Sequence, residues 1–303
     1  MMLLGTDYAA SRLEHQVKCL KEIGVRFVVR YLSLPQYSWK MLTRDEAQMI
    51  AGQGLGIVSV FQARNTQIAD FAPDKADRDA SAALQSALEV GQPPGTPIYF
   101  AVDFDAQDKH MDTINQYLQR VQNRLQGQYT VGVYGSYRVV EQSVARYRWQ
   151  TYAWSYGQVS KKAQMIQFRN GVVVCGGAAD YNLAFGDPGF WPSPPQDTSF
   201  PPMPLVRRGS SGWEVSALQT LLAREGINAG PIDGIFGPKT EAAVREFQSR
   251  MGLYTDGIAG PNTWGVLLGT GGKPMPKEPE PDWKALYEAE RRKLERIRAI
   301  LEE

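Results

Sequence analysis

The sequence predicts an α/β fold: a (β/α) barrel with helices after the first five strands only, then a small all-α three-helix domain and a C-terminal helix. Three observations lead to this prediction. Short β-prone apolar segments alternate with amphipathic helical segments through residue 147, a pattern typical of a parallel sheet covered by helices. Beyond that point the gaps between strand-like segments become short, and residues 205–269 contain an internal repeat.

The first five strand–helix units follow from apolar periodicity and from residues that begin or end helices. Thr43 opens the second helix and forms a capping box with Glu46, and Gly91 follows the third helix. The expected strands are 2–8, 26–32, 55–62, 98–105 and 129–134. The expected helices are 11–23, one that starts at Thr43, 74–90, 108–125 and 136–147.

Three further strands complete the expected barrel, which ends near Trp191. They are expected at 151–155, 164–168 and 172–181, with gaps of about eight and three residues. A crossover that carries a helix needs roughly ten to twelve residues, so no helix can follow the sixth or seventh strand.

Two carboxylates stand at the end of the fourth expected strand, whose sequence is IYFAVDFD. Asp103 and Asp105 are two residues apart, so on a regular strand their side chains face the same side. The C-terminal ends of barrel strands carry the chemistry in barrel enzymes, and paired carboxylates there can divide acid and base roles. The alternative is that one Asp caps the next helix while the other faces solvent.

Composition argues against several partners. The formal net charge is +1, which gives no electrostatic footprint for nucleic acid. No apolar run approaches the length of a membrane span, so no membrane partner is expected. The N-terminal sequence MMLLGTDYAAS lacks a basic region and an apolar core, so we expect no signal peptide.

The two cysteines and two histidines suggest no metal site. Cys19 and Cys175 lie far apart in different elements, so no disulfide framework or zinc spacing follows from them. We expect Cys19 to fill the core and Cys175 to be at most a free thiol. His15 falls on a helix and His110 at the start of the fourth helix, and neither has a second ligand nearby in sequence. The expected cofactor content is none.

The chain after the barrel divides into four parts. The expected boundaries are a barrel at 1–191, a Pro-rich linker at 192–204, a helical domain at 205–269, a second linker at 270–281 and a C-terminal helix at 282–303. The linkers predict domains that fold separately. In the helical domain, the frame DGIxGPxT occurs at 233–240 and 256–263, and helices are expected at 213–225, 238–251 and 261–268. The C-terminal helix has an apolar stripe, which fits either docking on the chain itself or self-association.

The order of the barrel motifs resembles glycoside hydrolase family 25 lysozymes and, more closely, the related glycoside-hydrolase-like barrel domain. The motifs are Gly5-Thr6-Asp7, Asp103-Phe104-Asp105, Trp154, Gln167-Phe168 and Asp180-Tyr181-Asn182. One position departs from the family 25 pattern, since Asp105 stands where that family has Glu. Residues 206–268 resemble the three-helix peptidoglycan-binding domain of cell-wall hydrolases, through the LQ, FQ and DGIxGPxT motifs.

These resemblances imply a peptidoglycan-degrading glycosidase, a muramidase-type endolysin of a phage. Asp105 would be the general acid, and Asp103, Asp7 and Asp180 would hold charge beside the reacting sugar. The expected substrate-binding residues are Tyr31, Gln62, Tyr134, Trp154, Gln167 and Asn182, with packing of the aromatic ones as the alternative. No metal site is expected.

Two other functions stay open. The first is a non-catalytic wall-binding protein on a degenerate barrel, which the Asp in place of Glu supports. The second is an amidase, for which the chain offers only His15 and His110. The expected partner is bacterial peptidoglycan. Without a signal peptide, the expected location is the host cytoplasm until release, and then the cell wall.

Overall fold

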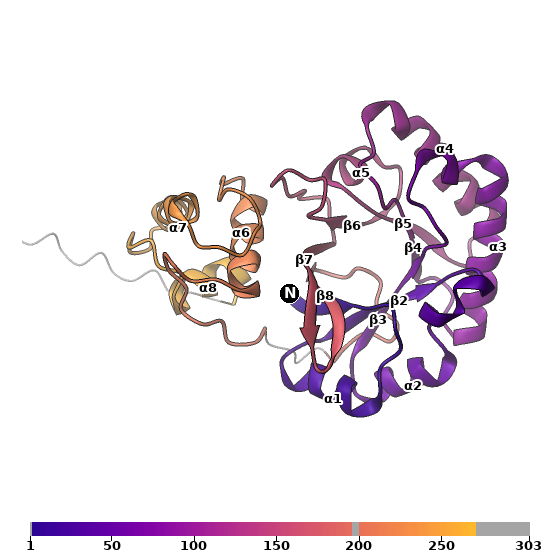
Figure 1. The fold of residues 1–303 in the computed structure, drawn as a ribbon, viewed down its shortest axis with the longest axis horizontal. Coiled ribbons are helices and arrows are strands. Elements are labelled where there is room, and N and C mark those ends of the chain that lie inside the picture. The colour runs from indigo at the N-terminus through magenta and orange to yellow at the C-terminus, as the bar shows by residue number, and fades with distance from the viewer. Residues whose placement is uncertain (1, 196–199, 271–303) are drawn as a thin grey trace, which may run out of the picture.

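The computed structural model describes residues 2–195 and 200–270. The expected C-terminal helix at 282–303 and nearly all of the second linker lie outside these ranges. Eight strands close into a barrel in the order of the sequence, as predicted. A helical domain follows it (Figure 1). No helix within the described ranges combines the length and apolar character that a membrane span requires.

The barrel strands are mostly parallel, but β8 is not. The strands are β1 (Met2–Asp7), β2 (Phe27–Leu32), β3 (Gly56–Phe61), β4 (Pro97–Ala101), β5 (Thr130–Gly135), β6 (Tyr147–Thr151), β7 (Met165–Val174) and β8 (Gly177–Phe185). Neighbours from β1 to β7 pair in parallel. Strand β8 runs antiparallel to both β7 and β1. The two-residue turn between β7 and β8 explains this, because parallel strands need a much longer crossover.

Helices after the first five strands cover the outside of the barrel (Figure 1). They are α1 (Glu14–Glu22), the 3₁₀ helix η1 (Pro35–Lys40), α2 (Arg44–Gly52), the 3₁₀ helix η2 (Ile68–Phe71), α3 (Pro73–Val90), α4 (Asp108–Arg124) and α5 (Tyr137–Gln142). Thr43 caps α2 by accepting a hydrogen bond from the Glu46 amide at 3.2 Å. Gly91 ends α3 with φ +81°, a conformation that glycine adopts without strain.

Apolar side chains form one layer inside the barrel and one outside it. Adjacent residues of a strand alternate between the layers, so Leu3 lies in the interior cluster and Leu4 in the outer one. Large aromatic side chains fill the interior. They approach so closely that a side chain at Gly132 would come within 2.7 Å of the Tyr99 ring. The interior is therefore a packed core rather than a pore.

Two expected strands were misplaced. Strand β6 ends at Thr151, where the prediction began it, because residues 152–157 form an irregular loop. Residues 172–174 belong to β7, which runs into a hairpin with β8. Helix α5 is also shorter than predicted and ends at Gln142.

The helical domain contains α6 (Trp213–Arg224), α7 (Pro238–Arg250) and α8 (Pro261–Leu268), close to the predicted ranges. Its sequence repeat has a structural cause. Buried Gln219 donates its side-chain amide to Asp233, to the Ile235 carbonyl and to Thr240. Gln248 makes the equivalent set of bonds one repeat later. Each Asp-Gly-Ile turn is therefore held by a glutamine on the preceding helix.

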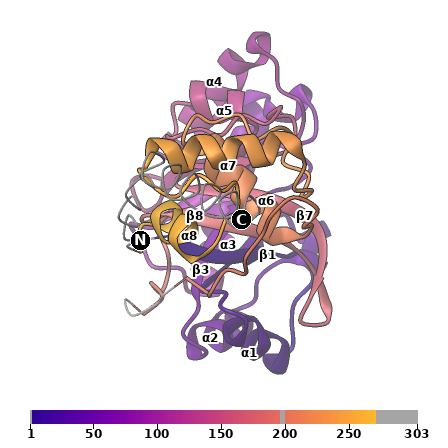
Figure 2. The ribbon, with the colours of Figure 1, turned by 90° about the vertical axis from the view of Figure 1, so that its left-hand side faces the viewer.

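Helix α6 packs where a barrel helix would otherwise cover β7 and β8 (Figures 1 and 2). Trp213 lies 5.1 Å from the Tyr181 ring centre and 6.5 Å from that of Phe168. Arg224 lies 3.9 Å from the centre of the Phe185 ring and donates to the Ser160 carbonyl at 2.6 Å. The domain boundaries at the linker remain a prediction, but these contacts join the two domains.

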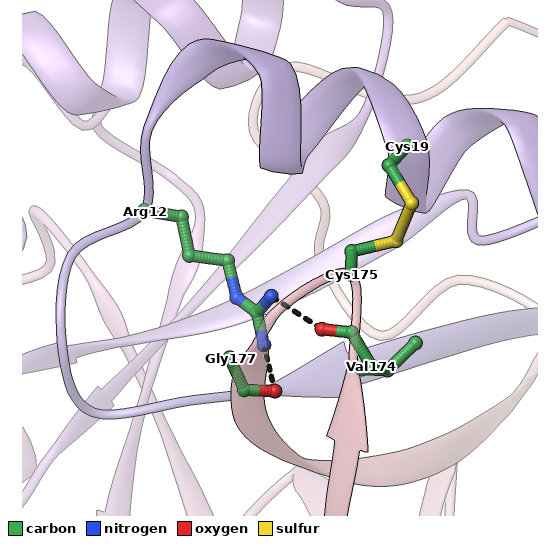
Figure 3. The surroundings of a disulfide bond; sticks show 5 residues. All are labelled: Arg12, Cys19, Val174, Cys175 and Gly177. Carbon is green, nitrogen blue, oxygen red and sulfur yellow. Dashed lines mark hydrogen bonds between the residues drawn. A yellow bond between two sulfur atoms is a disulfide. The ribbon is translucent and has the colours of Figure 1, made fainter.

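A disulfide joins α1 to the turn between β7 and β8, contrary to prediction (Figure 3). Cys19 and Cys175 are separated by 156 residues, with their Cα atoms 5.8 Å apart. Buried Arg12 binds the same hairpin, donating to the Val174 carbonyl at 2.8 Å and to the Gly177 carbonyl at 3.1 Å. Sequence spacing could not reveal the bond, because the fold alone brings these two elements together.

Candidate active site

A polar cavity of about 190 Å³ opens at the end of the barrel where the parallel strands terminate. Its lining residues are Tyr31, Val60, Gln62, Ala101, Asp103, Tyr134, Trp149, Gln167, Asn170 and Asp180. A larger hollow of about 440 Å³ lies at the opposite end, beside the start of β2 and β3, and three of its seven lining residues are basic. The chemistry-bearing side chains gather in the smaller cavity.

Asp7 lies directly beneath this cavity at the end of β1, with 3% of its surface exposed. Its Oδ1 accepts hydrogen bonds from Gln167 Nε2 at 2.9 Å and from Asn182 Nδ2 at 2.7 Å. Burial, helped by the nearby charge of Asp180, raises the pKa of Asp7 to about 7. Asp7 therefore holds a proton over much of the range below neutral pH.

Asp180 faces the cavity from β8. Its two oxygens accept from Gln167 Nε2 at 3.1 Å and from the Gly171 amide at 2.8 Å. Burial and the charge of Asp103 raise the pKa of Asp180, while the Gly171 bond opposes the rise. Asp180 was expected at the C-terminal end of a strand. It instead lies in the first half of antiparallel β8, which brings it to the same end of the barrel.

Gln167 links the carboxylates of β1 and β8. Its Oε1 accepts from the Tyr134 hydroxyl at 2.8 Å and from Thr151 Oγ1 at 3.0 Å. Because both donors bind the oxygen, the amide nitrogen is directed at Asp7 and Asp180. One side-chain amide therefore serves two carboxylates at once.

Asp103 lines the opposite side of the same cavity. Its Oδ2 accepts from Gln62 Nε2 at 2.9 Å, and Gln62 Oε1 accepts from Lys40 Nζ at 3.3 Å. Burial raises the pKa of Asp103, against the bond from Gln62 and the charge of Lys40. Lys40 is 7% exposed, and burial lowers its pKa to about 8.

Asp105 does not line the cavity. The regular strand ends at Ala101, so the alternation that predicted a shared face for Asp103 and Asp105 does not reach them. A turn follows, in which the Ala106 amide donates to the Phe104 carbonyl at 2.8 Å. Asp105 Oδ2 accepts from the Tyr156 hydroxyl at 3.2 Å instead. The structure thus groups three of the four expected carboxylates.

The expected substrate-binding residues separate into three groups. Four of them line the cavity: Tyr31, Gln62, Tyr134 and Gln167. Asn182 is fully buried behind it, between Asp7 and the indole of Trp149, which donates to Asn182 Oδ1 at 2.9 Å. Trp154 lies in the loop after β6, 37% exposed and outside the lining.

Sequence reasoning missed Lys40, Trp149 and Asn170. Lys40 had a usable signal, since it stands among aromatic residues in the segment that follows β2, at the catalytic end of a barrel. His15 is exposed on α1, and His110 Nδ1 accepts from the Gln107 amide at the start of α4. Within residues 2–195 and 200–270, no three His, Cys, Asp or Glu side chains form a group that could hold a metal ion.

Comparison with known families agrees with this architecture. Residues 18–183 match the family model for the Rv2525c-like, glycoside hydrolase-like domain. The chain belongs to this family. Residues 211–267 match the model for a peptidoglycan binding domain. The protein therefore joins an Rv2525c-like barrel to a peptidoglycan-binding domain, and membership of family 25 itself is not confirmed.

Individual relatives match only parts of this chain. The crystal structure of the Mycobacterium tuberculosis Tat-secreted protein Rv2525c with L-tartrate shares its fold, at 24% identity and a TM-score of 0.55 over 63% of this chain and 98% of that one. The uncharacterized protein YbfG of Bacillus subtilis is 33% identical over 143 residues, 43% of this chain and 20% of its own. The spore cortex-lytic enzyme of Bacillus cereus is 42% identical over 64 residues, 21% of this chain and 25% of its own. The chain spans about half or less of the curated relatives it matches.

Storage in a host cytoplasm, as expected from the N-terminal sequence, is contradicted. The M. tuberculosis protein that shares the Rv2525c-like fold is described as Tat-secreted. The Cys19–Cys175 disulfide agrees with this correction, because such bonds are rare in cytosolic proteins.

Proposed function

We propose that the Rv2525c-like barrel hydrolyses glycosidic bonds of peptidoglycan, with muramidase-type cleavage as the specific reaction. The observation that supports this is the placement of Asp7, Asp103 and Asp180 around one partly buried cavity. Carboxyl groups with raised pKa values beside ionised ones are what glycosidic bond cleavage requires. The attached peptidoglycan-binding domain supplies the choice of polymer.

Asp103 is the proposed general acid. It lines the cavity, burial raises its pKa, and its carboxylate accepts one side-chain bond, from Gln62. Asp180 accepts two bonds, from Gln167 and the Gly171 amide, which favour its ionised form. It is the proposed base or nucleophile. Asp7 is too buried to reach substrate and would adjust the charge on Asp180 through Gln167.

One observation favours a second function, binding without hydrolysis. The position where family 25 carries its acid is Asp105, and that side chain bonds to Tyr156 outside the cavity. A barrel that lost its acid could still bind wall glycan. In that reading Asp103 and Asp180, which line the cavity, would hold a sugar through hydrogen bonds to its hydroxyl groups.

Digestion of purified bacterial cell walls tests the two functions. Hydrolysis by the intact protein should release new reducing ends, whereas an amidase would release new amines. Asp103→Asn should reduce reducing-end release by about 10²–10⁴-fold while wall binding persists. Asp112→Asn, the same change at an exposed position of α4, should have no effect. Wall binding without reducing ends from the intact protein would establish the binding function.

We also propose that the protein works outside the cytoplasm. An oxidising compartment would preserve the Cys19–Cys175 bond, and peptidoglycan lies outside the membrane. Thiol titration of protein taken from the culture medium and from cells tests this, with bonded cysteines expected only in the exported pool. Self-association through residues 282–303 stays a prediction, since that segment lies outside the described residues.

A further inference from the structure

We infer that the loop at residues 152–157 forms an aromatic rim that binds sugar rings of a glycan strand, with Tyr156 as the contact residue and Asp105 as the side chain that positions it. This inference rests on the proposed function, because it extends the site from the cavity onto the surface. It also gives Asp105 a role other than that of proton donor.

The rim loop exposes two aromatic residues in strained backbone. Tyr156 is 80% exposed and Trp154 is 37% exposed. Their φ angles are +52° and +53°, a left-handed conformation that bulky residues seldom adopt. Such strain persists only where the surroundings enforce it, and it recurs at ligand-binding sites. Here buried Ser155 enforces it, by donating to the Thr151 carbonyl at 2.5 Å and accepting from the Tyr137 amide at 2.9 Å.

The rim loop is connected to the cavity at its start. The Tyr152 amide donates to the Gln167 carbonyl at 3.0 Å, and Thr151 Oγ1 donates to the Gln167 side chain. Gln167 is the residue that binds Asp7 and Asp180. At its other end, the loop reaches the helical domain, where an added side-chain carbon at Gly157 would lie 3.3 Å from the Gly230 carbonyl. The rim therefore lies between the carboxylates and the peptidoglycan-binding domain.

The Tyr156–Asp105 hydrogen bond is a third contact that fixes the rim, besides those with Gln167 and with the helical domain. The two residues come from the β6–β7 and β4–α4 loops, and the bond measures 3.2 Å. The bond fixes the Tyr156 ring while leaving it exposed to solvent. The conformational entropy of this side chain is therefore lost on folding and not on ligand binding. A sugar ring offers a C–H face to an aromatic ring and hydroxyl groups to its polar edge. A cavity of about 190 Å³ cannot enclose a polymer, so the strand must continue over the surface.

Binding and turnover of uncrosslinked glycan strands of defined length test this inference. Binding is measured in the Asp103→Asn background, so that hydrolysis is not required. Tyr156→Ala should weaken binding about tenfold, and Asp105→Ala several-fold. Asp105→Asn should restore most of the affinity, because its amide oxygen still accepts the tyrosine hydrogen bond. In the active protein the loss should fall on KM rather than kcat.

Two further variants sharpen the result. Tyr156→Phe removes the same hydrogen bond as Asp105→Ala. The double variant Tyr156→Phe/Asp105→Ala should therefore bind glycan no more weakly than either single variant. Asp112→Ala, on the exposed face of α4, is the matched control. Unchanged glycan binding by Tyr156→Ala would contradict the inference that the rim binds sugar rings. A loss of kcat in Asp105→Asn as large as in Asp105→Ala, with binding intact, would make Asp105 the proton donor instead. If no variant hydrolyses glycan but binding depends on Tyr156, the rim stands and the proposed hydrolysis fails.

Discussion

Asp7 and Asp180 lie opposite each other in the antiparallel β1–β8 ladder and share the side-chain amide of Gln167. This pairing exists because β8 runs against its neighbours, which returns its first half to the end of the barrel that carries the cavity. Two carboxylates so placed favour retention of one proton between them. The protonation of the buried member therefore affects both stability and the charge presented to the cavity.

The titration of Asp7 should be visible as a pH dependence of stability. Its pKa is about 7 in the folded protein, against 3.8 for an ordinary Asp. The folded state thus binds more protons between these values, so stability should fall as pH rises from about 4 to about 7, and then level off. Asp7→Asn should flatten this dependence, measured as thermal unfolding from pH 4 to 8. An unchanged slope in Asp7→Asn, equal to that of Asp112→Asn, would contradict the assignment.

Lys40 should set the pH range over which Asp103 acts as an acid. The charge of Lys40 lowers the pKa of Asp103, so Lys40→Met should raise that pKa. The alkaline limb of the kcat/KM profile for wall hydrolysis should then shift to higher pH, since the acid stays protonated longer. Lys18→Met, at an exposed position of α1, provides the comparison. A shift to lower pH would show that the alkaline limb belongs to another group.

Reduction of the Cys19–Cys175 bond should destabilise the barrel substantially. The bond closes a loop with a sequence separation of 156 residues. Native disulfides in secreted domains typically contribute about 2–5 kcal/mol. Denaturant unfolding with and without a reductant measures the effect. The variant Cys19→Ser/Cys175→Ser should have the same free energy of unfolding as the reduced protein, and reductant should not change it further. If reductant destabilised this variant as much as the unaltered protein, it would be acting at a place other than the disulfide.

Trp213 should stabilise the barrel although it belongs to the helical domain. It packs on Phe168 of β7 and Tyr181 of β8, at a place where no described helix of the barrel covers these strands. Trp213→Ala should cost roughly 1–3 kcal/mol, below the range for a fully buried Trp. Tyr254→Ala, at a 75% exposed position of the same domain, should cost nothing measurable. Equal stability of the chain ending at Trp191 and the full chain would show that the domains are independent.

Much of the fold was predictable because it depends on local signals. Thr43, Gly91 and the Gly-Pro turns mark helix ends, and the described helices after β1 to β4 and in the helical domain were predicted closely. The misplacement of β6 came from a local conflict: Trp154 is apolar and looks like a strand residue, but it adopts a left-handed conformation in a loop.

The site was less predictable, because it depends on contacts between distant elements. Asp103 and Asp180 were found from their positions at one end of the barrel. The alternation rule failed for Asp105, since β4 ends at Ala101. Neither the Cys19–Cys175 bond nor the placement of Lys40 beside Gln62 follows from spacing, because the closed barrel alone brings these residues together.

The packing of α6 against β7 also bears on where along a glycan the protein could act. A binding domain on a free tether lets an enzyme reach any bond within the length of the tether. Here Trp213 and Arg224 hold the wall-binding domain against the barrel. The distance between a sugar bound by that domain and the cavity carboxylates is therefore fixed. Each cut would then fall at a set distance along the strand from the sugar that the wall-binding domain binds.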